Sequence, residues 1–433
     1  MTGSEGHISS SKRRFGLLLA LLLTCGGPAA ADTSSARSNA PEQLDNPYLV
    51  LISVDGFRWD FADRYGAENI ASIGVRGLRA DALQPVFPTL TFPNHYSIAT
   101  GRLPAEHGLV ANEFPSADRS RWYLYKDRTT VEDGDWYLAE PIWVTAEKNG
   151  MLSAAYFFVG TEADVGGVHP THWRAFDADV SGEQRVRQVL DWLGQPAAHR
   201  PHLITLYFED VDDYTHWHGP GSPESREAIR RVDGQIGQLL RGIEELPYGD
   251  EVYVLLVSDH GTASYDEDRA PLVLDTVVDL AGISTVEGGP YVYLWFDAGE
   301  AHRAENVRDS INAQWDCGRA LLAEDTPPAW GIRPGGRFPD LIVQADPGCA
   351  VLSSAEAAHK ITPGDHGWAP EMTEMRGVFY AMGPRIPVGA RPGIVSVTDI
   401  HGLMMTILEL PDSSREGGPA GRLAELLLPA AAD

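Results

Sequence analysis

The sequence predicts an α/β fold, in which a doubly wound, mostly parallel central sheet is flanked by helices. Apolar, β-branched runs at residues 48–54, 202–208 and 252–257 are typical of strands that are buried on both faces of a parallel sheet. Segments with helical periodicity lie between these runs, and strands that alternate with helices build doubly wound sheets. Each run is also followed by acidic or histidine residues, and open sheets of this kind place their sites at the carboxyl ends of strands.

Two helices and two more strands complete the predicted sheet region. Apolar residues recur at helical spacing over residues 182–193 and, after the start signal Ser222-Pro223-Glu224, over residues 225–245. We expect further strands at residues 338–343 and 376–382, where short apolar runs recur.

Three other stretches fit the sheet pattern less well. Residues 113–140 and 160–176 are rich in aromatic and charged side chains, so we expect insertions over the site rather than sheet elements. Residues 288–337 could form a small lobe. Otherwise, residues 47–425 are expected to form a single domain.

The composition of the 433 residues limits which ligands the protein can be expected to bind. Hydrophobic residues make up 43% and charged residues 22%, which is ordinary for a globular protein, but the net charge is −27. Such a charge argues against binding to polymeric nucleic acid, which requires clustered Lys and Arg. A small phosphate-bearing substrate would have to be captured by local positive charge, which bound metal ions supply.

The N-terminus has the pattern of an export signal. Lys12-Arg13-Arg14 precedes an apolar run at 15–23 and the small residues Ala29-Ala30-Ala31, which predicts a signal peptide over 1–31 and a periplasmic or extracellular protein. The apolar run is too short to span a membrane, so we expect no transmembrane segment in the mature chain. Cys25 faintly resembles a lipoprotein processing site, but Thr24 fits poorly, and we expect export without a lipid anchor.

The two ends of the predicted domain and its cysteines complete the organisation. Residues 32–46 are expected to be a disordered leader and residues 426–433 a flexible tail. Only Cys317 and Cys349 remain after signal removal, and in an exported chain they suggest one disulfide, which would stabilise the fold by roughly 2–4 kcal/mol. Two unpaired thiols are the alternative.

Three Asp and three His lie on motifs at the ends of these elements, and they are candidate metal ligands: Asp55, Asp212, His216, Asp259, His260 and His366. Six ligands are enough for two metal ions with three protein ligands each, and sites with an open position are catalytic rather than structural. Each residue alone has an ordinary reading, such as a solvated acidic loop or a surface His. The whole set favours a two-metal site, and mixed Asp and His ligands suit zinc.

A hydroxyl beside such ions is a candidate nucleophile, because coordination to a metal lowers its pKa. Thr91 and Thr89 both lie in the segment Pro-Thr-Leu-Thr-Phe-Pro-Asn-His. On a strand-like segment the two hydroxyls would face the same side, so the spacing does not separate them.

These motifs together resemble the nucleotide pyrophosphatase/phosphodiesterase family of the alkaline phosphatase superfamily. The matching stretches are Ser-Val-Asp-Gly at 53–56, Thr-Phe-Pro-Asn-His-Tyr at 91–96, Thr-Gly-Arg-Leu-Pro-Ala-Glu-His-Gly-Leu-Val-Ala-Asn at 100–112, Tyr-Phe-Glu-Asp-Val-Asp at 207–212, His218-Gly219-Pro220, Ser-Asp-His-Gly at 258–261 and His366-Gly367. The resemblance covers most of residues 48–410 and implies an alkaline phosphatase-like catalytic domain.

The family pattern implies two zinc ions and a role for each motif. Asp212, His216 and His366 would hold one ion, and Asp55, Asp259 and His260 would hold the other, together with Thr91. The resemblance thus favours Thr91 over Thr89 as the nucleophile, which would form a phospho-threonine intermediate. It implies that Asn112 donates to a phosphate oxygen, and that Phe92 and Tyr207 line a nucleobase slot. The implied reaction is hydrolysis of a small nucleotide diester or anhydride to a nucleoside 5′-monophosphate.

Several other functions stay open at this stage. The same chemistry could serve a lysophospholipid or choline-type diester, a phosphomonoester or a phosphonate, and a silent metal-dependent binding protein is the non-enzymatic alternative. The chain also departs from the family pattern at residues 157–160, Phe-Phe-Val-Gly, and at Thr262, where Met is common. We expect both departures to reshape the substrate pocket without removing a ligand.

Overall fold

A computed structural model describes residues 37–411 and 422–429, to which the structural statements below refer. The predicted signal peptide over 1–31, including Cys25, lies outside the described residues. Within them, no helix combines the length and apolar character that crossing a membrane requires.

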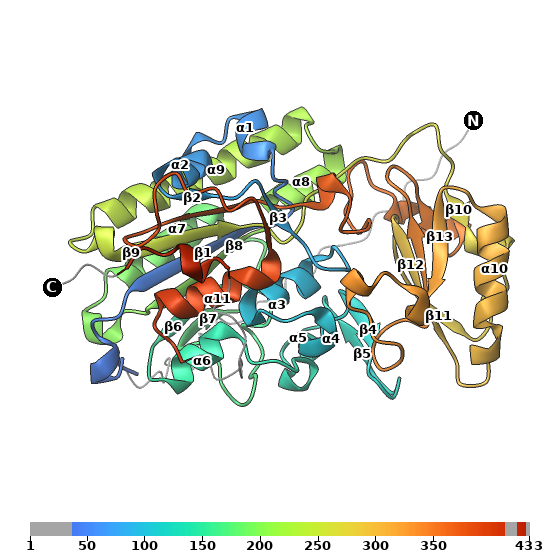
Figure 1. The fold of residues 1–433 in the computed structure, drawn as a ribbon, viewed down its shortest axis with the longest axis horizontal. Coiled ribbons are helices and arrows are strands. Elements are labelled where there is room, and N and C mark those ends of the chain that lie inside the picture. Colours follow the sequence, from blue (N-terminus) through green and yellow to red (C-terminus); the bar gives the residue numbers. More distant parts are fainter. Residues whose placement is uncertain (1–36, 412–421, 430–433) are drawn as a thin grey trace, which may run out of the picture. The chain divides into compact units, whose positions relative to one another are not determined.

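A seven-stranded, mostly parallel sheet forms the centre of the fold, as predicted (Figure 1). The strands are, in their order across the sheet, β2 (Leu78–Arg79), β16 (Phe379–Met382), β9 (Val252–Val257), β1 (Tyr48–Val54), β8 (Leu203–Phe208), β6 (Ser153–Tyr156) and β7 (His172–Arg174). Strand β1 pairs in parallel with β8 and β9, so Leu51 lies between Thr205 and Leu255. Strand β16 runs antiparallel to β9, and β2 runs antiparallel to β16.

Helices cover both faces of this sheet, which explains why its central strands β1, β8 and β9 are almost wholly apolar. One face packs against α1 (Phe61–Tyr65), α2 (Glu68–Arg76), α7 (Gly182–Leu193) and α9 (Pro223–Glu244), and the other packs against α3 (Thr91–Thr100), α6 (Ile142–Lys148) and α11 (Val397–Ile407). Figure 1 shows α2 and α9 on one side of the sheet and α3, α6 and α11 on the other. Successive residues of β1 point to opposite faces, so Val50 joins the first core and Leu51 the second.

The predicted helices begin where the sequence places their start signals. Ser222 caps α9 by accepting a hydrogen bond from Ser225 N, and Pro223 occupies the first helical position, which needs no N–H partner. A capping box of Ser181 and Gln184 begins α7.

A second sheet lies where a small lobe was expected over 288–337, and its strands extend beyond those limits on both sides. It is antiparallel and four-stranded, in the order β11 (Ile283–Gly288), β12 (Tyr291–Phe296), β14 (Leu341–Ala345) and β13 (Gly318–Leu322), and α10 (Ala304–Gln314) packs on it. The strand expected near 338–343 thus belongs to this second sheet, because β14 pairs with β12 and β13. Cys317 and Cys349 form a disulfide, with Cα atoms 6.0 Å apart, at the end of this sheet.

Short elements complete the described chain: β3 (Ala82–Gln84), α4 (Pro104–His107), β4 (Glu113–Pro115), β5 (Trp122–Leu124), α5 (Arg128–Val131), α8 (Asp210–His218), β10 (Leu272–Val273), β15 (Val351–Leu352) and β17 (Ile394–Ser396). The expectation that residues 160–176 hold no sheet element is wrong, because β7 pairs with β6 at the edge of the central sheet. Its three residues, half exposed at the edge, are too few to show a strand period.

The expected disorder of residues 32–46 does not hold for residues 37–46. Asn39 is buried, donates to Ala197 O and Arg200 O, and accepts from Leu152 N, which fastens this segment to the domain. Part of the expected flexible tail is also attached, since Leu428 N donates to Arg385 O. Neither the polar composition of residues 37–46 nor the Leu-Leu-Leu-Pro run at 426–429 indicated these long-range contacts.

Candidate active site

The six candidate ligands converge at the carboxyl edge of the central sheet. Asp55 directly follows β1, and Asp259 and His260 follow β9 after one residue. Asp212 and His216 lie one turn apart on α8, which begins two residues after β8. His366 comes from the loop that precedes β16 in the chain. Neighbouring parallel strands thus bring together residues that lie more than 150 positions apart.

Asp55, Asp259 and His260 form one group, in which one ligand atom from each residue lies within 4.8 Å of the others. His260 Nε2 is 3.5 Å from Asp55 Oδ1 and 3.1 Å from Asp259 Oδ2. All three side chains are buried.

Asp212, His216 and His366 form the second group by the same measure. The spacing of four residues on α8 places His216 Nε2 3.3 Å from Asp212 Oδ2. The two groups are adjacent, because the rings of His260 and His366 stack with centroids 3.7 Å apart.

The three histidines are oriented by hydrogen bonds at Nδ1. His260 Nδ1 lies 3.2 Å from Gly261 O, and His366 Nδ1 lies 2.8 Å from Thr89 O. His216 Nδ1 lies 3.2 Å from the hydroxyl of Thr362, which itself donates to Gly364 O. A carbonyl or an already donating hydroxyl can only accept, so Nδ1 carries a proton in all three rings, which leaves Nε2 as the nitrogen that could bind a metal ion.

The carboxylates supply a test of whether the site fits a cation. Asp55 Oδ1, Asp212 Oδ1 and Asp259 Oδ2 are buried without a hydrogen-bond partner among the described residues. Asp259 Oδ2 lies 3.1 Å from His260 Nε2 and 3.3 Å from His95 Nδ1, but it forms a hydrogen bond with neither. Buried, unpaired carboxylate oxygens are costly unless they coordinate a cation. The residues therefore fit a pair of divalent metal ions.

Electrostatics of the metal-free site point the same way. Burial, with the charges of Asp259 and Asp212, raises the pKa of Asp55, and burial with the charge of Asp212 raises the pKa of Asp259 to about 8. Burial lowers the pKa values of His260 and His366. In the metal-free protein this site therefore disfavours the ionised carboxylates, whereas bound cations would stabilise them.

Asp212 and His216 behave as an ion pair instead. Burial opposes the charge on both, but their mutual attraction is stronger, so the pKa of Asp212 is lowered and that of His216 is raised to about 10. A cation bound at this group would displace the proton of His216.

The structure separates the two candidate hydroxyls. Thr91 is the first residue of α3, is partly exposed, and has its Oγ1 3.4 Å from His260 Nε2. Thr89 is buried, donates to Trp368 O at 2.7 Å and accepts from Gly367 N at 3.0 Å. Thr89 therefore fastens the loop that carries His366, and only Thr91 presents its hydroxyl beside the ligands.

Asn112 lies next to the start of α3. Its Oδ1 accepts a hydrogen bond of 3.1 Å from Phe92 N, which fixes which end of the amide is the carbonyl. Among the described residues no acceptor takes its amide protons, so the NH₂ group is available to a ligand above Thr91.

Tyr207 contacts a candidate metal ligand, which the resemblance does not imply. Its hydroxyl donates to Asp55 Oδ2 at 2.6 Å, and its ring meets His95 edge-on at 5.4 Å. Sequence reasoning missed two nearby aromatics, Phe176 and Tyr125. Phe176 is 44% exposed and its ring lies 6.2 Å from that of Tyr207, while the ring of Tyr125 lies 5.7 Å from that of Phe92. Their signal was the aromatic content of the two segments expected to cover the site.

The two departures from the family pattern differ in how they could affect the substrate pocket. Thr262 is fully buried, so it does not reshape a pocket by direct contact. Phe157 is also buried, in a left-handed backbone conformation (φ 55°), with the Arg185 guanidinium 4.8 Å from its ring centre. Its ring packs 5.1 Å from that of the exposed Phe176, so it can affect the pocket only through that neighbour.

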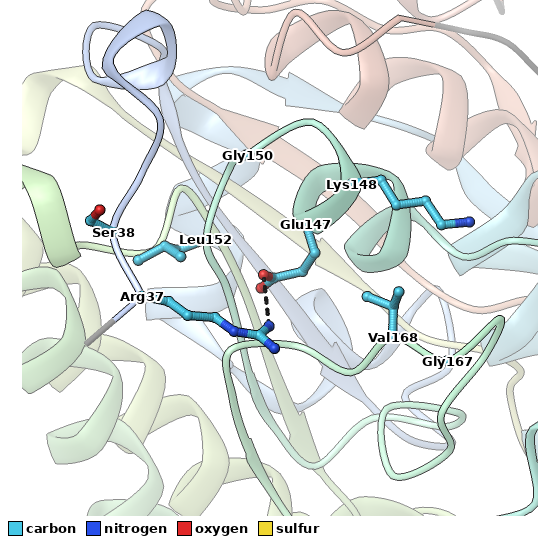
Figure 2. Close-up of a pocket in the computed structure, with 8 residues that line it drawn as sticks. All are labelled: Arg37, Ser38, Glu147, Lys148, Gly150, Leu152, Gly167 and Val168. Carbon is cyan, nitrogen blue, oxygen red and sulfur yellow. Dashed lines mark ion pairs between the residues drawn. The ribbon is translucent and has the colours of Figure 1, made fainter. Parts of the chain in front are cut away.

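Two surface cavities lie outside the ligand groups. One, of about 340 Å³, lies at the amino end of β6, whereas the ligands lie at the carboxyl edge. Figure 2 shows Arg37 and Glu147 paired across it, at 3.7 Å. Glu147 already accepts from Ser153 N and Thr171 N, which leaves it little capacity for a ligand. The other, of about 480 Å³, lies beside the second sheet and contains none of the six ligands.

Comparisons with known sequences agree with this arrangement. A sequence profile described as type I phosphodiesterase/nucleotide pyrophosphatase matches residues 49–369. Ectonucleotide pyrophosphatase/phosphodiesterase family member 1 of Homo sapiens is 28% identical over 385 residues, which cover 87% of this chain and 41% of that protein. An uncharacterised pyrophosphatase/phosphodiesterase of Schizosaccharomyces pombe is 29% identical over 397 residues, which cover 87% of this chain and 79% of that protein. The chain thus spans less than half the length of the human protein.

Solved structures give the same result. Murine ectonucleotide pyrophosphatase/phosphodiesterase 5 superimposes with a TM-score of 0.81 and 26% sequence identity, over 88% of this chain and 100% of that chain. A structure of an inactive threonine-to-alanine variant of that protein, in complex with AMP, superimposes with a TM-score of 0.81 and 25% identity over the same shares. Because the profile spans most of the chain and these structures share its fold, the chain belongs to the type I phosphodiesterase/nucleotide pyrophosphatase family and is a hydrolase of that family.

Proposed function

We propose that this protein is a secreted two-zinc phosphodiesterase/pyrophosphatase that hydrolyses nucleotide diesters or anhydrides to nucleoside 5′-monophosphates, with Thr91 as the nucleophile. The observation that carries the proposal is the hydroxyl of Thr91, 3.4 Å from His260 Nε2, beside two groups of three metal ligands. The unpaired oxygens of Asp55, Asp212 and Asp259 supply the charge that two zinc ions need.

Asp212, His216 and His366 would hold one zinc, and Asp55, Asp259 and His260 would hold the other, beside Thr91. When bound, the two ions would lower the pKa of the Thr91 hydroxyl and neutralise the charge that develops on the phosphate. Two metals also suit in-line displacement, since the attacking and leaving oxygens lie on opposite sides of phosphorus.

The chain's own groups account for the covalent step. Thr91 Oγ1 gives up its proton to solvent and attacks phosphorus, so that a new P–O bond forms, while the bond to the leaving group breaks with its electron pair on the leaving oxygen, which takes up a proton from solvent. Water then attacks the phospho-threonine, restores the Thr91 hydroxyl and releases the monophosphate. The NH₂ group of Asn112 and the free N–H of Thr91 at the start of α3 would stabilise the non-bridging oxygens.

Aromatic side chains at the rim support a nucleotide as the substrate. Two aromatic pairs, Phe92 with Tyr125 and Phe176 with Tyr207, offer faces on which a base could stack. The murine relative was captured with AMP as a threonine-to-alanine variant that is inactive, which supports both a nucleotide ligand and a nucleophilic threonine.

Export is part of the proposal. The pairing of Cys317 with Cys349 supports an oxidising compartment, where disulfides form and persist. The basic and apolar N-terminal segment of the sequence supports it independently.

A comparison of two chromogenic substrates tests the substrate class. The zinc-loaded protein is assayed with the p-nitrophenyl ester of thymidine 5′-monophosphate and with p-nitrophenyl phosphate. We expect a strong preference for the diester in kcat/KM, whereas preference for the monoester would overturn the proposed substrate class.

The base slot is tested with Phe176→Ala. This substitution should raise KM for the thymidine ester but leave KM for bis-p-nitrophenyl phosphate, which has no base, nearly unchanged. An equal effect on both substrates would contradict stacking of the base on Phe176.

A further inference from the structure

His95 is a buried histidine that contacts the candidate active site without being one of its ligands. Its Nδ1 lies 2.9 Å from Thr91 O and 3.3 Å from Asp259 Oδ2, and its Nε2 lies 2.8 Å from the hydroxyl of Ser53. The side chains of His95, Ser53 and Asp259 are fully buried. Every polar atom of this ring therefore has a partner at or beside the site.

These partners determine which ring nitrogen carries the proton. The carbonyl of Thr91 can only accept, so the proton is on Nδ1, which donates to Thr91 O and faces Asp259 Oδ2. Nε2 then holds a lone pair and accepts from the hydroxyl of Ser53. The carbonyl of Thr91 thus fixes the tautomer, and the hydroxyl of Ser53, which can donate or accept, donates to Nε2 and supports it.

The His95 ring contacts residues from three elements that meet at the candidate active site. Ser53 belongs to β1, Asp259 follows β9, and Thr91 begins α3. The rings of Phe158 and Tyr207 meet His95 edge-on at 5.1 Å and 5.4 Å, so its plane cannot rotate freely. The distance between Thr91 and the ligand Asp259 is therefore set through one rigid side chain.

A second buried histidine, His107, contacts α3 but none of the candidate ligands, and it serves as a structural comparison for His95. His107 Nδ1 accepts from Leu109 N, and its Nε2 lies 3.2 Å from Pro93 O and 3.0 Å from the hydroxyl of Ser97. These bonds require the opposite tautomer, protonated at Nε2. His107 also packs against α3, but none of these partners is a candidate ligand or Thr91.

We propose that His95 is a positioning residue for the nucleophile: its Nδ1 proton binds the carbonyl of Thr91, its ring lies against the carboxylate of Asp259, and the hydroxyl of Ser53 donates to its Nε2. The inference rests on the proposed function, because it gives Thr91 its role. It concerns the reaction rate rather than substrate affinity, since His95 is buried and cannot contact the substrate.

Substitution tests the proposal in the full-length, zinc-loaded protein. His95→Leu removes the donor at similar volume, and kcat for the nucleotide diester should fall about 100-fold, as for a displaced reacting group, with KM little changed. His95→Asn places an amide donor near the position of Nδ1. It should raise kcat about tenfold above that of the leucine variant, which is the effect expected from restoring one hydrogen bond. Ser53→Ala, the mildest change, should lower kcat by a smaller factor and serves if His95→Leu fails to fold.

His107→Leu is the matched control, because it also removes a buried histidine beside α3. We expect it to lower the thermal midpoint about as much as His95→Leu but to change kcat by less than about tenfold per folded molecule, since it displaces no reacting group. Bound zinc is measured in every variant. Any one of three results would overturn the proposal: equal losses of kcat in both leucine variants, no rescue by asparagine, or a loss of zinc that accounts for the lost turnover.

Two further readouts separate this inference from the proposed function. If Thr91→Ala retains full turnover, the proposed function fails, whereas an inactive Thr91→Ala beside a fully active His95→Leu refutes only the role of His95. Independently of catalysis, ¹⁵N NMR of histidine-labelled, metal-free protein should show the Nδ1–H tautomer for His95 and the Nε2–H tautomer for His107. An Nε2–H tautomer at His95 would exclude its hydrogen bond to Thr91 O.

Discussion

The hydroxyl of Tyr207 donates a hydrogen bond of 2.6 Å to Oδ2 of Asp55, while Oδ1 of the same carboxylate has no hydrogen-bond partner among the described residues. Tyr207 lies on β8 and Asp55 follows the neighbouring β1, so the bond joins adjacent strands at the carboxyl edge of the sheet. It leaves one carboxylate oxygen for a metal ion and holds the other in place. Such outer partners orient ligands and tune metal affinity.

Tyr207→Phe should therefore weaken zinc binding while keeping the aromatic ring. We expect roughly a 10- to 100-fold loss of zinc affinity, the usual effect of removing a ligand's outer partner, and little change in KM for a nucleotide diester. Competition with a chelator of known affinity measures the first quantity and steady-state kinetics the second. Tyr123→Phe is the control, because its hydroxyl bonds Tyr137 rather than a ligand. Unchanged zinc affinity in Tyr207→Phe would show that the hydrogen bond does not support Asp55.

In the metal-free protein, ionisation of Asp259 should destabilise the folded state in a pH-dependent way. Burial and the charge of Asp212 raise its pKa to about 8 in the folded state, above the ordinary value of 3.8. A raised pKa means that the folded state is favoured while the group is protonated, and that this stability is lost as the pH rises from about 4 through 8.

Asp259→Asn removes this titration and retains an oxygen that can accept from Gly56 N. Without metal, the variant should have a higher thermal midpoint than the wild type at pH 8, and the difference should shrink toward pH 5. With zinc at pH 8 the order should reverse, because the amide is a poorer ligand and ligand binding stabilises the folded state. A difference that does not vary with pH would contradict the raised pKa.

Gly56→Ala should damage the site through Asp212. Gly56 has a φ of 65°, and an added Cβ would lie 2.6 Å from Asp212 Oδ1, one of the unpaired oxygens. Gly66→Ala is the matched control, since its φ is 71° but nothing lies within 4 Å of the added Cβ.

Both alanines should lower the free energy of unfolding by roughly 1–2 kcal/mol, because left-handed backbone is unfavourable for a residue with a Cβ. Only Gly56→Ala should also lose bound zinc and turnover per folded molecule. These are measured by denaturant unfolding, metal analysis and diester hydrolysis. Full zinc content and activity in Gly56→Ala would mean that Asp212 tolerates displacement.

Much of the fold was predictable because the buried strands are long apolar runs with clear ends. Strands β1 and β9 have the predicted limits, and each is followed by its candidate ligands within three residues. Five of the six ligands follow one of the strands β1, β8 and β9, which made them identifiable, whereas His366 was identified from its Gly-Asp-His-Gly motif in a loop. The edge strand β7 was missed because three half-exposed residues carry no period.

Other features of the site depend on contacts that the sequence cannot show. Tyr207 and Asp55 are separated by 152 residues, and nothing near either one indicates their hydrogen bond. The spacing of Thr89 and Thr91 did not separate the two hydroxyls, whereas their partners in the structure differ: Thr89 bonds the loop of His366 and Thr91 lies beside His260. Residues 37–46 have a disordered composition but are fastened by Asn39 to a distant loop.

The most direct test of the central claim is turnover of a nucleotide diester by Thr91→Ala, with bound zinc measured in the same samples. The account predicts that the variant keeps its zinc, since six other ligands remain, while kcat falls on the order of 10³-fold or more, as when a catalytic nucleophile is removed. Thr91→Ser, which keeps a hydroxyl, should retain much of the activity. Undiminished turnover in Thr91→Ala with zinc fully bound would contradict the account.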